Sequence, residues 1–159
     1  MESKYAQAKL DFLDTLFHGF ENQELDDYTK SHIAKYLTVL CSGVFEDIIK
    51  NFILELSQKD TLRKEIKEFI FKKVQWSLNN PKYPKLTTFL DEFNKEWAKK
   101  LNERVEVKNK DALTSIVNNK NLIAHGNSST ITFPLIKQHY EDSKVIIEQL
   151  DSIILQESG

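Results

Sequence analysis

A lysine, an asparagine and a histidine lie within six residues of one another in the stretch NNKNLIAHGNSS, residues 118–129. Histidine changes its charge near neutral pH, which suits it to proton transfer. Gly126 directly follows His125 and is placed to end a helix, because glycine readily adopts the positive φ found just past helix C-termini. The helix dipole at that end favours the protonated imidazole. The segment therefore predicts a titrating histidine that the following chain leaves uncovered.

Lys120 falls in the middle of an apolar helical stripe. At about 100° per residue, the stripe consists of Leu113, Ile116, Val117, Ile123 and Ala124. A cation in a core-facing stripe is unfavourable unless it is paired, reaches solvent or meets a wet cleft. Asn121 lies between Lys120 and His125 on the helical wheel, and Asn121 and His125 are one turn apart. Either these three groups form a polar site beside the core, or His125 satisfies terminal carbonyls while Lys120 reaches solvent.

The chain that must position these residues has the pattern of consecutive amphipathic helices. Apolar spacing predicts helices over residues 5–20, 25–56, 61–78, about 86–101, 109–124 and about 132–154. The second is the central helix, because its apolar face is broad enough to be surrounded by others. Asp60 and Asn109 are the expected N-caps of the third and fifth helices. Residues 79–84 form the clearest turn, because Pro81 and Pro84 prevent the third helix from continuing.

These elements predict an all-α fold: a single domain over residues 1–159, built as an antiparallel bundle of about five to six helices. A chain of 159 residues is about one domain long. Its 40% hydrophobic and 29% charged residues, with 4 Gly and 3 Pro, are typical of an ordered helical protein. Trp97 shares a regular apolar face and is expected in the core.

Cysteine usage and the N-terminus indicate a cytoplasmic protein. The single cysteine, Cys41, lies in an apolar run, which excludes a disulfide framework and a CxxC metal site within the chain. The N-terminus lacks the uninterrupted apolar region of a secretory signal, and no apolar stretch of about 20 residues exists to span a membrane.

Charge is distributed unevenly along the chain. Residues 62–110 hold 13 Lys and Arg against 7 Asp and Glu, a local charge of +6, while the remainder carries −8. A basic middle favours a polyanionic partner. The alternative is that these lysines form solvated helix faces, as in many helical bundles.

The stretch NNKNLIAHG followed by SSTIT resembles the RNxIAHG signature of HEPN domains (higher eukaryotes and prokaryotes nucleotide-binding). The branch that it resembles is associated with ribosomal L-PSP-like proteins. GVFEDIIKNFI, residues 43–53, is similar to the long second helix of that family. ALTSIV, residues 112–117, resembles the lead-in to the motif, and residues 140–155 resemble the closing helix. The resemblance implies a HEPN-like fold over most of the chain.

The resemblance also implies a metal-independent endoribonuclease whose composite site forms where two motifs meet across a homodimer. His125 is the motif histidine, and Lys120 stands where the family has arginine. Asn121 matches the polar residue that follows this arginine, and Glu46 matches an acidic position on the second helix. The catalytic candidates are thus His125, Lys120, Asn121 and Glu46, and Lys120 and Asn121 would bind substrate. No metal and no cofactor are implied.

Metal-free RNA cleavage needs a base for the 2′-OH proton, a cation for the charge on phosphorus and an acid for the leaving 5′-oxygen. One histidine cannot be acid and base at once, which favours pairing of two chains. We expect a homodimer that acts on RNA as a toxin or antiviral defence effector, with an antitoxin or other defence protein as a further partner. The alternatives are a non-catalytic HEPN-like module that binds RNA, nucleotide or protein, because lysine lacks the bidentate fork of arginine, and a purely structural helical domain.

Overall fold

Seven α-helices and one π-helical turn make up the part of the chain that the computed structural model describes, residues 1–59 and 61–156. The elements are α1 (Lys4–Glu21), α2 (Asp27–Lys59), α3 (Lys64–Ser77), α4 (Tyr83–Phe93), α5 (Lys95–Arg104), α6 (Val107–Ala124), α7 (Phe133–Asp151) and η1 (Ser152–Gln156). No strand occurs among these residues, which confirms the all-α prediction. None of the described helices combines the length and apolar character needed to cross a membrane.

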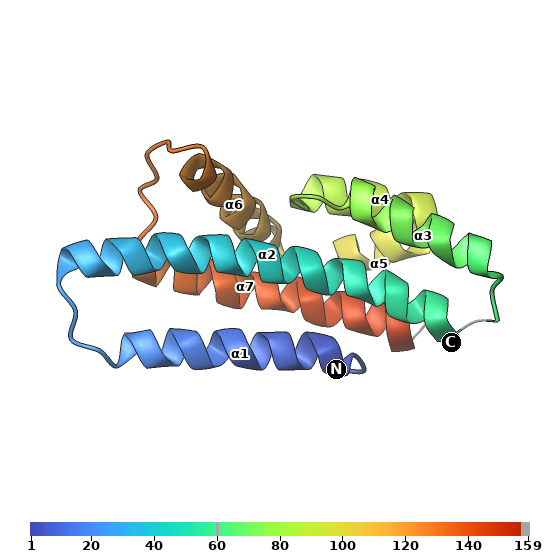
Figure 1. Cartoon of the computed structure of the whole chain (residues 1–159), viewed down its shortest axis with the longest axis horizontal. Helices are drawn as coiled ribbons and strands as arrows, with labels where there is room; N and C mark the ends of the chain where they lie inside the picture. Colours follow the sequence, from blue (N-terminus) through green and yellow to red (C-terminus); the bar gives the residue numbers. More distant parts are fainter. Residues whose placement is uncertain (60, 157–159) are drawn as a thin grey trace.

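The two longest helices, α2 and α7, lie side by side and form the centre of the molecule (Figure 1). α1 runs antiparallel to α2 along one side, and α6 packs on α2 and α7 from the other. The short helices α3, α4 and α5 gather near the C-terminal half of α2. α2 and α7 run in the same direction, because the intervening helices carry the chain back to the N-terminal end of α2.

An aromatic stack joins α1, α2 and α7 in the core. The ring of Tyr140 lies 4.7 Å from that of Phe17 and 6.0 Å from that of Phe45, measured between centroids. The Tyr140 hydroxyl donates to Asp14 Oδ1 at 2.6 Å, and burial, with this hydrogen bond, raises its pKa. Cys41 is fully buried among the same helices, and burial raises the pKa of its thiol. These contacts fix the frame on which α6 packs.

Asn94 divides the predicted fourth helix into α4 and α5. Its backbone is extended, with φ −159° and ψ 112°, and its side chain accepts a hydrogen bond from the Glu96 amide. Asparagine competes well for such an N-cap position, because its side-chain oxygen satisfies a free amide at the start of the next helix. Trp97, on α5, is buried as predicted. This division explains why the chain has more helices than the five to six expected.

Several predicted helix ends differ from the observed ones. α6 starts at Val107, with Glu106 as N-cap, and Asn109 is the third helical residue, whose side chain accepts from the Glu106 amide at 2.8 Å. In a capping box, the N-cap residue and the third helical residue bond to each other's backbone amides, so Asn109 belongs to the box without being the N-cap. α4 begins at Tyr83 with Pro84 in its first turn, where proline is favoured because that turn needs no amide donor. α3 starts only at Lys64, and the predicted cap Asp60 lies outside the described residues.

Candidate functional site

The end of α6 displays the predicted histidine to solvent. His125 is the C-cap residue, and Gly126 follows with φ 71°, as expected from its position. The amide of Gly126 donates to the carbonyl of Ile123, and that of Asn127 donates to the carbonyl of Leu122 at 2.8 Å. This pair of bonds is the Schellman motif, which satisfies helix-end carbonyls with backbone donors. The exposed ring of His125 is therefore not needed to cap the helix.

Lys120 lies where α6 leaves the core. Ile116 and Val117 are buried as predicted, whereas Ile123 is half-buried and Ala124 is exposed, so the apolar stripe ends earlier than its sequence pattern indicates. Lys120 is half-buried, and its Nζ donates to Asn80 Oδ1 at 2.7 Å. The cation is thus satisfied by an amide oxygen from the loop between α3 and α4, residues 78–82.

The α3–α4 loop connects Lys120 to Glu46. Asn80 has a positive φ of 52°, and its amide donates to Glu46 Oε2 at 2.8 Å. The other oxygen of Glu46 accepts from Lys50 Nζ at 2.7 Å, and Lys50 also donates to Asn79 Oδ1 at 2.9 Å. Lys50 is only 8% exposed, and its two acceptors offset the free-energy cost of burying its charge. One network thus joins α2, the α3–α4 loop and α6.

Glu46 and Lys120 line a common groove of about 470 Å³ on the outer side of α2. Val39 and Gly43 form part of its floor, and Lys9, from α1, borders it and forms an ion pair with Asp47 at 3.2 Å. Hydrogen bonds to Asp47 and Tyr5 raise the pKa of Lys9. The groove therefore contains three cations, Lys9, Lys50 and Lys120, beside two carboxylates.

The four sequence-predicted residues separate into two pairs. The structure brings Glu46 and Lys120 together, on α2 and α6, which pack side by side. Asn121 is half-buried and His125 exposed, on an adjacent flank of α6, and neither is among the described residues lining the groove. Along α6, His125 therefore lies about one and a half helical turns beyond Lys120.

Sequence reasoning missed Lys50 and Asn80 as members of this network. Lys50 lies four residues after Glu46, a spacing that predicts an ion pair on a helix. Asn80 precedes Pro81 in the turn, and asparagine is one of the few residues that tolerate a positive φ. Neither signal indicates that the turn reaches Lys120 of α6, which lies 40 residues after Asn80.

A family model described as RiboL-PSP-HEPN matches residues 6–156, nearly the whole chain. The chain belongs to the RiboL-PSP-HEPN family. No curated protein and no solved structure matches it. As a HEPN domain, it is of an all-α, RNA-related type, and the matched range includes α6 with its NNKNLIAHG stretch.

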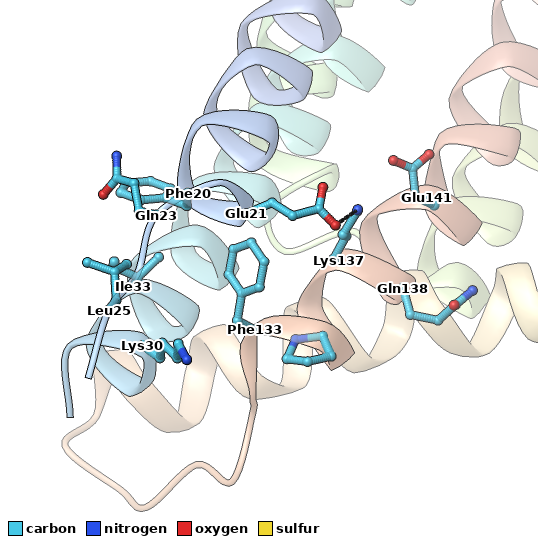
Figure 2. Close-up of a pocket in the computed structure, with 11 residues that line it drawn as sticks. Phe20, Glu21, Gln23, Leu25, Lys30, Ile33, Phe133, Lys137, Gln138 and Glu141 are labelled. Atoms are coloured by element: carbon cyan, nitrogen blue, oxygen red, sulfur yellow. Dashed lines mark hydrogen bonds and ion pairs between the residues drawn. The ribbon is translucent and has the colours of Figure 1, made fainter. Parts of the chain in front are cut away.

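A second hollow of this HEPN protein, larger than the groove, lies away from the motif. It has a volume of about 540 Å³ and lies between the end of α1 and the start of α7 (Figure 2). Lys137 donates to Glu21 across it at 2.5 Å, which lowers the pKa of Glu21. None of its lining residues is a motif residue. Among the described residues, no cluster of three His, Cys, Asp or Glu side chains could hold a metal ion.

Proposed function

We propose that this HEPN protein is a metal-independent endoribonuclease that acts as a homodimer. The observation that carries the proposal is the arrangement of α6: it directs Lys120 towards a groove and leaves the His125 ring exposed at its C-cap. The other three histidines lie on α1, at the start of α2 and on α7, outside the motif. We assign the second proton-transfer group to His125 of the partner subunit.

The proposed reaction is an internal transfer at phosphorus. One neutral His125 takes the proton of the ribose 2′-OH, and the 2′-oxygen forms a bond to phosphorus while the bond from phosphorus to the 5′-oxygen breaks. The imidazolium of the partner's His125 gives its proton to the leaving 5′-oxygen. Lys120 stabilises the negative charge on the phosphoryl oxygens. The products are a 2′,3′-cyclic phosphate and a 5′-hydroxyl.

Each candidate residue then has a distinct role. Asn121, between Lys120 and His125 on α6, contacts the RNA or orients the ring. Glu46 is a positioning residue, because both of its carboxylate oxygens already hold Lys50 and the Asn80 amide. Lys120 keeps two further N–H donors beyond the one given to Asn80, and these are available to phosphate.

The outer face of α2 supports self-association. Tyr36 and Val39 are exposed there, and a side chain at Gly43 would meet no atom within 4 Å. A partner's backbone can therefore approach closely at this point. We propose a two-fold axis on this face, since an isologous interface sets one patch against its own copy, and a pairing that turns both His125 rings into one cleft.

A second candidate function is RNA binding without cleavage. It is favoured by Lys120 itself, which replaces the motif arginine and has one donor already bonded to Asn80. Lysine is a point charge and cannot grip a phosphate by two parallel hydrogen bonds. In this alternative, Lys120 and His125 hold RNA, and the cellular role is that of a binding module.

The test is incubation of the purified protein with mixed RNA in EDTA, followed by analysis of the product ends. We expect cyclic phosphate and 5′-hydroxyl ends from the wild-type protein and none from His125→Ala. His18→Ala, an exposed histidine near the end of α1, is the matched control and should cut normally. RNA binding without cleavage by any of these proteins would favour the second candidate.

Mixed dimers test whether both histidines are required. When equal amounts of wild-type and His125→Ala subunits exchange, random pairing leaves about a quarter of the dimers with two histidines. Activity should then fall to about a quarter of that of the same total amount of wild-type protein, whereas independent sites in each subunit would retain about half. Expression in cells tests the toxin or antiviral role, in which growth arrest should depend on His125.

A further inference from the structure

One face of α3 exposes two large aromatic side chains with two lysines between them. Trp76 is 80% exposed and Phe69 is 69% exposed, far more than core aromatics such as Trp97 at 7%. Lys72 lies three residues after Phe69 and four before Trp76, and Lys73 lies four after Phe69 and three before Trp76. All four therefore share one side of the helix, which we name the aromatic–lysine face.

The packing of α3 accounts for this exposure. Val74 is the only fully buried residue within the described helix, and α3 packs mainly against α2. Figure 1 shows α3 on the outside of the molecule, near the C-terminal half of α2. Aromatic side chains of this size bury large areas when they are covered, so two of them exposed on one side of a helix indicate a surface that binds a partner.

We propose that the aromatic–lysine face binds single-stranded RNA by stacking bases on Trp76 and Phe69. Single-strand binding sites combine aromatic rings, which stack on any base, with cations that follow the phosphates. The two rings are seven residues apart, which separates them by about 10.5 Å along the helix and leaves Lys72 and Lys73 between them for the intervening phosphates. The inference rests on the proposed function only in taking RNA as the ligand.

Charge supports a polyanion on this face over an apolar protein surface. Lys72 is exposed, whereas Lys73 forms an ion pair with Glu92 of α4 at 2.6 Å, in which both side chains remain partly exposed. Residues 62–110, which include α3, carry the local charge of +6. Two carboxylates at the margin of the face are paired with lysines, Glu92 with Lys73 and Glu68 with Lys64 at 3.7 Å. A third, Glu65, lies a turn before Phe69.

The face also adjoins the candidate site. Gln75, the residue before Trp76, lines the groove that contains Lys120 and Glu46. Asn79, three residues after Trp76, bonds to Lys50 of that groove. A strand held at Lys120 can therefore continue onto α3, and the face would bind nucleotides next to the one that is cut.

The test measures RNA binding in the His125→Ala background, so that it is independent of cleavage. The probe is a labelled single-stranded oligoadenylate of about 12 nucleotides, within the range bound by single-strand binding modules. Trp76→Ala or Phe69→Ala should raise the dissociation constant roughly five- to 100-fold. Trp76→Phe should restore binding, because phenylalanine also stacks on bases. The matched control is Tyr28→Ala, a residue 76% exposed near the start of α2.

Two further readouts test whether the RNA lies on this face itself. RNA should quench the fluorescence of exposed Trp76 more than that of buried Trp97. Lys72→Gln should reduce the slope of log affinity against log salt by about 0.7. In the active protein, Trp76→Ala should raise KM and leave kcat nearly unchanged.

Affinity equal to that of Tyr28→Ala in both aromatic variants would overturn the inference. A second outcome would also overturn it. If Trp76 emission shifts to the blue as the protein concentration rises without RNA, and if Trp76→Ala no longer forms dimers, the face joins two copies of the chain. If the wild-type protein does not cut RNA while both alanine variants lose binding, the nuclease proposal fails and the stacking face stands.

Discussion

Asn80 offers the sharpest test of how the α3–α4 loop holds the candidate site. Its side chain accepts from Lys120 Nζ at 2.7 Å, and its backbone has a φ of 52°. Replacement by glycine removes the first feature and preserves the second. Replacement by alanine removes both, because a Cβ is unfavourable in the left-handed region unless the side chain compensates.

The expected losses follow from these two features. A hydrogen bond to a charged group contributes about 1.5–3 kcal/mol, and half-exposure of Lys120 reduces this to about 0.5–1.5 kcal/mol. Glycine adds about 0.4–1 kcal/mol to the loss of stability, because it gives the unfolded chain more conformational freedom. Alanine instead adds about 1–2 kcal/mol of backbone strain. Asn80→Gly should thus cost about 1–2.5 kcal/mol and Asn80→Ala about 1.5–3.5 kcal/mol.

Urea unfolding followed by circular dichroism measures both losses, with an unchanged slope as the sign that only stability has altered. A double-mutant cycle with Lys120→Met isolates the bond between the two residues, and its coupling energy should be about 0.5–1.5 kcal/mol. If Asn80→Gly is less stable than Asn80→Ala, the argument from positive φ is refuted. A coupling energy near zero would refute the argument that Asn80 holds Lys120.

Three other predictions concern the site and the core. Lys120→Arg should raise RNA cleavage or binding and Lys120→Ala should lower it, in nuclease and binding assays, with a loss of stability no larger than the Asn80 bond's contribution of about 0.5–1.5 kcal/mol. Unchanged activity with a falling melting temperature would make Lys120 structural. Glu46→Ala should lower the free energy of unfolding in urea by about 2–3 kcal/mol, because it leaves the buried Lys50 with Asn79 as its remaining acceptor. Glu46→Gln should lower it less, and equal stability of the wild-type protein and both variants would contradict this. Burial lowers the pKa of His139, against a smaller opposing effect of Asp142, so the unfolded chain binds the proton more readily. The stability that the neutral, buried His139 ring contributes is complete above the unfolded pKa of about 6.5 and is lost as pH falls through the lower folded pKa. His139→Gln should flatten this dependence of stability on pH, and an unchanged pH profile would contradict it.

The sequence predicted most of the helices because each has a long periodic apolar face. It failed at Asn94, where the apolar period continues across the break, and one extended residue with a favourable cap outweighs the helical pattern. It also placed the start of α6 late, because Asn109 has the residue type of a cap but acts three residues inside the helix. Such errors are local, and they leave the packing of α2, α6 and α7 intact.

The candidate site was predictable only in part. The spacing of α6 marked Lys120 as misplaced in an apolar stripe, and the resemblance to HEPN domains selected Glu46. The bond from Lys120 to Asn80 was not predictable, because it depends on how a distant turn folds against α6. The exposure of Phe69 and Trp76 was equally hidden, since a helical period does not reveal which apolar face remains uncovered.

The burial of Cys41 gives the protein an internal reporter of its own opening. A thiol reagent can reach this single cysteine only when the packing of α2 against its neighbours is transiently lost, and the raised pKa slows any reaction further. At low reagent concentration the labelling rate follows the equilibrium between closed and open forms, and at high concentration it follows the rate of opening. Labelling of each variant in native buffer would therefore distinguish a protein that has lost contacts with RNA from one whose core opens more often.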